Sequence, residues 1–323
     1  MSDEPELRNV VIMDPISFFV RPATIVICKH VPTADDPTHH LLDVHKICRK
    51  KKNRQWQKMT TAGVVESDVL ELLLSDHSEN IDKIRRLMIK FGLLVRLHSG
   101  VSDKEEYLVP ALLPPAIEGA AWSDSQWHTC YLVFTTSEEF KQYTTISTTD
   151  LKLLGFLPLG LFERLVGKAV VWSQSTSAHE NYTSFLLKQD EAVLFFGSKR
   201  FRLKMHLDMS VIEVNIEGQD PRIVYERLME QVQAIIGECL KSLHCFTTLM
   251  YPFSICDSSS PPFQLTDETF LIPLDQIRSI VASHSVLNRP GGRRLLTESD
   301  AASMYRDWLP HYKHTDRYDF FLR

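Results

Sequence analysis

The side chains most able to bind a charged partner form a basic run in the first sixth of the chain. This run comprises Lys46, Arg49, Lys50, Lys51, Lys52 and Arg54, and Trp56 lies close behind it. Clustered Lys and Arg side chains attract phosphate groups and carboxylates. We therefore expect a basic interaction loop that is either simply solvated or faces an acidic protein patch. Binding of nucleic acid through this loop is the alternative.

Histidine and cysteine residues gather in the same region, which raises the question of a metal site. His45 and Cys48 have the spacing of one pair of zinc ligands, but a zinc site needs further ligands at defined spacing. The nearby residues that do not complete such a set are Cys28, His30, His39 and His40. We expect no metal ligands and no cofactor, and incidental histidines in a polar segment.

The motifs of the common catalytic sites are missing from the sequence. Gly167-Lys168 is followed by Ala169, and Phe162 stands where a phosphate-binding loop would need its first glycine. Neither a Gly-x-Ser-x-Gly elbow nor a His-Glu-x-x-His helix occurs. A cysteine near a histidine does occur, but a chain with 13 histidines offers that by chance. We expect no catalytic residues and therefore no enzyme.

Composition and charge narrow the class of protein further. The chain has 323 residues, with 36 Lys and Arg against 41 Asp and Glu, so its net charge of −5 gives no general reason to bind nucleic acid or anionic lipid. No uncharged apolar run reaches the roughly 18 residues that cross a bilayer. The acidic N-terminus lacks the features of a secretion signal. We expect a cytoplasmic protein without a membrane partner, whose six cysteines are reduced.

The first part of the chain, residues 9–118, has the element order of a winged helix. Leucines predict a helix over 69–74, and Ile81, Ile84, Met88 and Phe91 predict an amphipathic helix that Ser78 caps and Gly92 ends. Apolar runs at 93–97 and 107–113 predict a hairpin. Upstream, residues 10–13 predict a short strand, and Asp14 with Pro15 predicts the start of a helix.

The rest of the chain predicts a sheet with covering helices. In residues 119–255 we expect strands over 131–135, 184–187, 192–196, 201–205 and 211–216, and helices over 155–172 and from Asp220 to Leu243. Residues 256–323 resemble a linker with short helices over 275–284 and after the Thr297–Asp300 capping box. The fold class is therefore α+β: a winged-helix-like N-terminal subdomain, then an α+β subdomain with a mainly antiparallel sheet.

Five segments in the right order resemble the COR domain of ROCO-family proteins. Each segment is modestly specific, and together they span residues 9 to about 250. They are Val10–Pro15 with Phe18-Phe19, Gly63–Val65 with the leucines that follow, Leu87–Leu94, Glu106–Leu113 and Phe156–Leu165.

The resemblance implies a regulatory and dimerisation module of a signalling protein, without catalysis of its own. Its winged-helix-like half, COR-A (9–118), would pack on Roc, a Ras-like GTPase domain. Its second half, COR-B (119–255), would form a homodimer. By their place in the motif, Phe156 and Leu157 would contact the GTPase domain, which would act from the same protein or from another chain. Tyr318–Leu322 also resembles the first strand of a TIR domain.

One alternative stays open beside this resemblance. A winged helix with a basic segment at 46–54 is also found in nucleic-acid-binding proteins. However, the first of the two core helices is acidic rather than basic, because it carries Glu66, Asp68 and Glu71. Nucleic acid is therefore the less favoured partner.

Overall fold

The computed structural model describes residues 11–28, 42–98, 104–115, 127–137, 143–176, 185–239, 243–250, 270–288 and 295–309. Helices alternate with antiparallel strands, so the fold is α+β as expected. The chain divides into two compact units, one of Met1–Trp122 with Pro158–Lys204 and one of Ser123–Leu157 with Met205–Arg323. This division differs from the expected domains, because residues 158–204 fold with the first unit.

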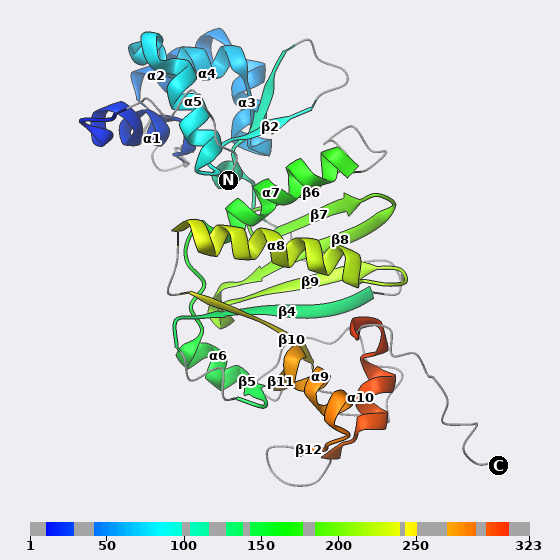
Figure 1. The fold of residues 1–323 in the computed structure, drawn as a ribbon. Helices are drawn as coiled ribbons and strands as arrows, with labels where there is room; N and C mark the ends of the chain where they lie inside the picture. The colour runs from blue at the N-terminus through cyan, green and yellow to red at the C-terminus, as the bar shows by residue number, and fades with distance from the viewer. Residues whose placement is uncertain are drawn as a thin grey trace, which may run out of the picture. The chain divides into compact units, whose positions relative to one another are not determined.

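The first unit contains a winged-helix arrangement in chain order. Its elements are α3 (Asn53–Ala62), β1 (Val64–Glu66), α4 (Ser67–Leu73), η3 (Ser75–Asn80), α5 (Ile81–Lys90), β2 (Val95–Leu97), β3 (Glu106–Leu108) and η4 (Pro110–Leu112). The three strands form an antiparallel sheet in the order β1-β3-β2 (Figure 1). Tyr107 is the central residue, opposite Val65 on one side and Arg96 on the other. The expected hairpin of β2 and β3 is confirmed.

Side-chain pattern and backbone conformation explain these elements. The amphipathic face of α5 buries Ile84, Leu87 and Met88, as the sequence predicts. The predicted cap is wrong, since Ser78 lies in η3 and the helix begins at Ile81. Gly63 ends α3 with a φ of +69°, and a Cβ there would lie 3.1 Å from the Val109 carbonyl oxygen, so the turn into β1 requires glycine.

Two expectations about the N-terminal region are wrong. Residues 11–13 form no strand. The helix that follows is real, because Asp14 Oδ1 accepts hydrogen bonds from the N–H groups of Ile16 and Ser17, both at 3.1 Å. It consists of the π-helical η2 (Ile16–Val20) and α1 (Arg21–Ile27). The basic run is also not a loop, since α2 (Asp43–Lys51) leads directly into α3.

The first unit is completed by a long helix on a three-stranded meander. These elements are α7 (Leu161–Thr176), β6 (Leu186–Leu187), β7 (Glu191–Phe196) and β8 (Lys199–His206), and the strands pair antiparallel. Trp172 of α7 packs on Phe196 and Phe201, with ring centroids 4.6 and 5.3 Å apart. On its other side α7 contacts β2 and η4 of the winged helix, where Gly167 lies against Val95.

The second unit is built on an antiparallel sheet in the order β5-β11-β10-β4-β9. The strands are β4 (Trp127–Thr135), β5 (Ile146–Ser147), β9 (Val211–Glu217), β10 (His244–Met250) and β11 (Phe270–Pro273). Its helical segments are α6 (Thr148–Leu154), η7 (Leu207–Met209) and α8 (Arg222–Cys239). Alternate residues of β4 face opposite sides, so Tyr131 and Val133 pack with Leu151 of α6, whereas the Leu132 face meets α8.

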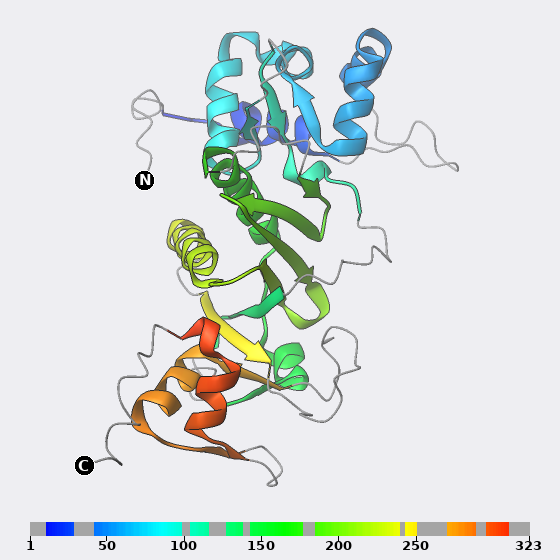
Figure 2. The same ribbon diagram turned by 90° about the vertical axis from the view of Figure 1, so that its right-hand side faces the viewer.

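The C-terminal region is more ordered than the sequence indicates. It contains α9 (Leu274–Ser283), β12 (Leu287–Asn288), β13 (Leu295–Leu296), α10 (Glu298–Met304) and η8 (Arg306–Trp308). α9 and α10 pack side by side (Figure 2). The Thr297–Asp300 capping box is confirmed. Strand β11 extends the sheet beside β10, so residues 270–309 belong to the second unit rather than to a linker. The predicted strand at 318–322 lies outside the described residues.

A buried histidine should make the stability of the first unit depend on pH. His45 is 1% exposed, and its Nε2 atom lies 2.9 Å from the Ile25 carbonyl oxygen. Burial lowers the pKa of His45, although the contact with Ile25 favours the charged form. The unfolded chain therefore binds a proton first, and stability is lost as pH falls from about 6.5 toward the lower pKa of the folded state.

We expect His45→Gln to reduce this pH dependence, since a glutamine amide can still donate to the Ile25 carbonyl. Urea unfolding at about pH 7.5 and about pH 5.5 should show the native protein losing about 1 kcal/mol more than the variant between the two conditions. Equal losses in both proteins would contradict this assignment.

Candidate protein-interaction surface

The segment after α6 is fixed to the end of β4 by its backbone. The N–H of Phe156 donates a hydrogen bond to the Phe134 carbonyl oxygen at 2.7 Å. Thr135 Oγ1 donates to the Leu154 carbonyl oxygen, also at 2.7 Å, and Thr135 forms a bridge with Gly155. The conformation of residues 154–156 therefore follows from the position of a central strand.

Gly155 allows this segment to pack closely on η7. A Cβ atom at this position would lie 2.3 Å from the Leu151 carbonyl oxygen and 2.9 Å from the Cβ of Ser210. Neither neighbour is the far end of a flexible side chain. A larger residue would therefore displace α6 from η7, and with it the side chain that follows.

Three large apolar side chains lie exposed on these elements. Leu153 of α6 is 75% exposed, Phe156 49%, and Leu207 of η7 56%. Because α6 and η7 are in contact, the three exposed side chains lie on neighbouring elements, and we call this set of residues the α6–η7 surface. Of the predicted pair, Phe156 lies on this surface and Leu157 is buried at 7% exposure. Contact of either residue with a GTPase domain stays a prediction.

The predicted basic residues lie on two consecutive helices. Lys46, Arg49, Lys50 and Lys51 belong to α2, Lys52 follows it, and Arg54 begins α3. Lys52 Nζ lies 2.7 Å from Asp68 Oδ2, and Lys46 Nζ lies 3.1 Å from Asp43 Oδ1. The other four cations are exposed. The structure therefore places them on a helical surface instead of a loop.

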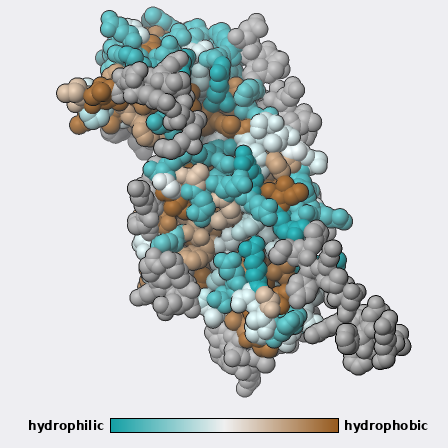
Figure 3. Space-filling view, viewed as in Figure 1, coloured by the Kyte–Doolittle hydropathy of each residue, from teal (hydrophilic) through white to brown (hydrophobic). Residues whose placement is uncertain are grey.

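The helix that would read DNA in a typical winged helix is largely covered here. Only Asp82, Lys83 and Lys90 are exposed among the ten residues of α5. The N-terminal helix packs against it, with the rings of Phe19 and Phe91 5.3 Å apart. Apolar side chains gather on the surface of this N-terminal helix (Figure 3), where Ile16 and Val20 of η2 are exposed. A recognition helix needs a free face to enter the major groove, and α5 offers little of one.

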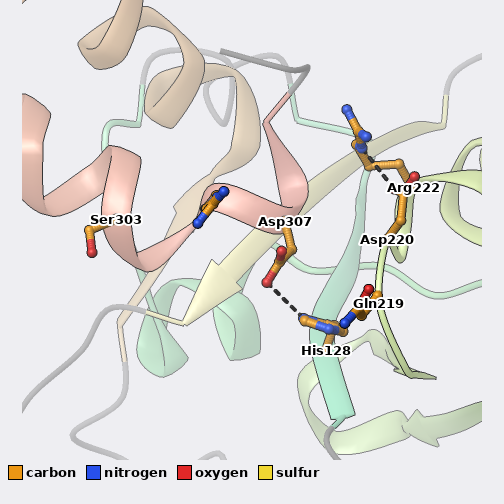
Figure 4. A pocket seen from close by; sticks show the side chains of 7 residues that line it. His128, Gln219, Asp220, Arg222, Ser303 and Asp307 are labelled. Carbon is orange, nitrogen blue, oxygen red and sulfur yellow. Dashed lines mark hydrogen bonds and ion pairs between the residues drawn. The ribbon is translucent and has the colours of Figure 1, made fainter. Parts of the chain in front are cut away.

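A polar pocket of about 520 Å³ lies in the second unit. Its residues include a serine, a histidine and an aspartate, the types of a catalytic triad (Figure 4). His128 Nδ1 lies 3.5 Å from Asp307 Oδ2, and Arg222 Nε donates to Asp220 Oδ1 at 2.9 Å. Ser303, however, lies on the far side of Asp307 from His128 (Figure 4). A nucleophile and a base are therefore not brought together.

These pocket residues attach the C-terminal helices to the sheet. Arg222 of α8 also donates to the carbonyl oxygen of Leu309 at 3.1 Å, and the rings of Tyr225 and Trp308 meet edge to face at 5.7 Å. Sequence reasoning missed this cluster, because its members come from three separate segments, at 128, 219–225 and 303–309, with no shared motif. Arg222 bonds both Asp220 and the Leu309 carbonyl oxygen, so these contacts serve structure.

The described residues also show no activated thiol and no metal cluster. Burial raises the pKa of the Cys48 thiol to about 11 and also raises that of Cys130, so both are poor nucleophiles near neutral pH. Both His45 and Cys48 lie in the hydrophobic interior of the first unit. No group of His, Cys, Asp or Glu in the described part of the chain could hold a metal ion. His30, His39 and His40 lie outside it.

The helices of the described segments do not reach the length and apolarity of a bilayer crossing.

Replacement of Gly155 should test how the α6–η7 surface is held. We expect Gly155→Ala to lower the free energy of unfolding by about 2 kcal/mol, because the added methyl group overlaps the backbone of α6. Gly237→Ala on α8 is the matched control, since nothing lies within 4 Å of the added methyl group. It should be neutral or stabilising by up to about 1 kcal/mol in the same urea titration. An unchanged stability of Gly155→Ala would refute the close packing.

Comparison with known proteins adds no family to this picture. No protein-family model matches the chain, and no curated protein is significantly similar to it in sequence.

Proposed function

We propose that the chain is a non-catalytic COR-type module that binds a Roc-type GTPase domain through the α6–η7 surface. The observation that carries this proposal is the half-exposed ring of Phe156 on a backbone held by the Phe134 carbonyl group. The module relays the nucleotide state of the GTPase domain to other parts of a signalling protein through protein contacts.

The physical case for a protein partner rests on exposed area and rigidity. Burial of Phe156, Leu153 and Leu207 against a partner would stabilise the complex by roughly 25 cal/mol per Å² of apolar surface removed from water. Aromatic side chains surrounded by apolar neighbours are frequent anchors of protein interfaces. Because the segment of Phe156 is already fixed, little conformational entropy is lost on binding. An exposed apolar set on a fixed backbone suits docking better than it suits catalysis.

The fold is compatible with the same proposal. A winged-helix arrangement followed by an antiparallel sheet with covering helices is the architecture that the COR resemblance implies. The resemblance also implies a homodimer formed through the second half of the domain, and we include this in the proposal.

Binding of nucleic acid is the second candidate. The cations on α2 and α3 favour it, because they are exposed and close together. The covered α5 speaks against the usual docking of a winged helix on DNA. We therefore rank an interaction with protein above an interaction with nucleic acid.

Charge at the centre of the α6–η7 surface should abolish binding of the GTPase domain. We expect Phe156→Glu to raise the dissociation constant for a purified Roc-type GTPase domain by about 100-fold, since the carboxylate cannot enter an apolar contact. Isothermal titration with the GDP-loaded domain and with a domain carrying a GTP analogue would measure this. Any effect of the chain on GTP turnover should disappear in the same variant.

Ile223→Glu is the matched control, because Ile223 is 50% exposed and lies on α8. It should bind like the native chain. If both variants bind as the native chain does, or if the native chain does not bind at all, the proposal is wrong.

A further inference from the structure

Two oppositely charged segments follow each other in the winged helix. Residues 43–58 contain seven Lys and Arg and one Asp. Residues 66–82 contain six Asp and Glu and no Lys or Arg. The whole chain carries a net charge of only −5, so this contrast is local and is not a result of composition.

Part of this charge is already used within the fold. Lys52 and Lys104 both reach Asp68 Oδ2, at 2.7 and 2.8 Å. Asp82 pairs with Arg85 at 2.5 Å. The pair of Lys52 with Asp68 joins the start of α3 to α4, so opposite charges of the two segments meet where the helices touch.

Seven exposed charges remain outside these pairs. The basic surface consists of Arg49, Lys50, Lys51 and Arg54 on α2 and α3, and the acidic surface of Glu71, Asp76 and Glu79 on α4 and η3. None of the seven forms an ion pair with another residue that the structure describes. The charge of each surface is therefore not neutralised by the described residues and can attract an external partner.

The two surfaces are neighbours, and this suggests which partner fits. α2 packs against α4, and η3 packs on α4. Cys48 of α2 and Leu70 of α4 share one hydrophobic core, so the charged sides of both helices point outward. A two-fold axis passing between the surfaces would place each basic surface on the acidic surface of the other copy. The charge pattern is thus self-complementary.

We infer that a second copy of this chain binds here, with the basic surface of each protomer against the acidic surface of its partner. The inference does not depend on the proposed GTPase coupling, because it uses neither α6 nor η7. It adds a contact in the winged helix to any dimer that forms through the other half of the molecule. A duplex nucleic acid on the basic surface is the competing occupant.

Charge reversal in the full chain tests this contact. Lys50→Glu, Lys51→Glu and Arg54→Glu together make both surfaces acidic, and Glu71→Lys with Glu79→Lys makes both basic. We expect each variant alone to raise the dissociation constant of self-association at least about tenfold in sedimentation velocity at about 25 mM NaCl. An equimolar mixture of the two should associate again, because both contacts of the heterodimer are attractive. This recovery also shows that the variants are folded.

Matched controls separate this contact from a general effect of net charge and from the α6–η7 surface. Glu226→Lys with Glu230→Lys on α8 changes the net charge by the same amount as Glu71→Lys with Glu79→Lys and should leave association unchanged. Raising the salt to about 500 mM NaCl should weaken the native association about tenfold or more. Phe156→Glu should leave it intact, so a failure of the GTPase proposal stays distinguishable.

Three outcomes would overturn the inference. One is a native chain that is strictly monomeric at low salt. Another is a dimer that both reversals and their mixture leave unchanged, since the contact would then lie elsewhere. The third is a monomer that binds duplex DNA at low salt and loses this binding in the Lys50→Glu, Lys51→Glu, Arg54→Glu variant.

Discussion

The hydrogen bond from the Phe156 N–H to the Phe134 carbonyl group ties the α6–η7 surface to a central strand of the sheet, β4. Residues 130–135 of β4 are all buried, and β4 lies between β9 and β10 in the sheet. A strand held on both sides has little freedom to shift, so residues 154–156, which are hydrogen-bonded to its end, are fixed as well. Gly155 completes the arrangement, because its missing side chain lets α6 approach η7. The orientation of Phe156 is thus set by the core.

The charged surface of the first unit is anchored in a comparable way. Burial alone would raise the pKa of Asp68, but the hydrogen bonds from Lys104 and Lys52 hold it below its ordinary value. The carboxylate is therefore ionised at neutral pH and fixes the junction of α2 and α3 on α4. In both surfaces, a few buried or paired groups fix the position of the backbone. The exposed residues beside them therefore start from a fixed backbone. Such presentation favours association with other proteins.

The elements with a strong apolar period could be predicted from the sequence, whereas the details of burial could not. Ile84, Leu87 and Met88 marked α5, and short strand-like apolar runs marked β7 to β9. Helix α2 was missed because its buried face is made by His45 and Cys48 instead of aliphatic residues. Strand β11 was missed because the Ser- and Pro-rich stretch before it suggested a linker. Leu153 and Leu207 gave no signal, since exposure depends on what packs nearby. The same reason explains why Phe156 and Leu157, adjacent and both apolar, differ in burial.

The central claim is that the α6–η7 surface docks a GTPase domain. Hydrogen–deuterium exchange of the full chain, alone and with a purified Roc-type GTPase domain in its GDP form and with a GTP analogue, tests it most directly. The account predicts slower exchange at residues 153–157 and 207–209 in the complex. A complex that protects other segments and leaves these residues unchanged would contradict it.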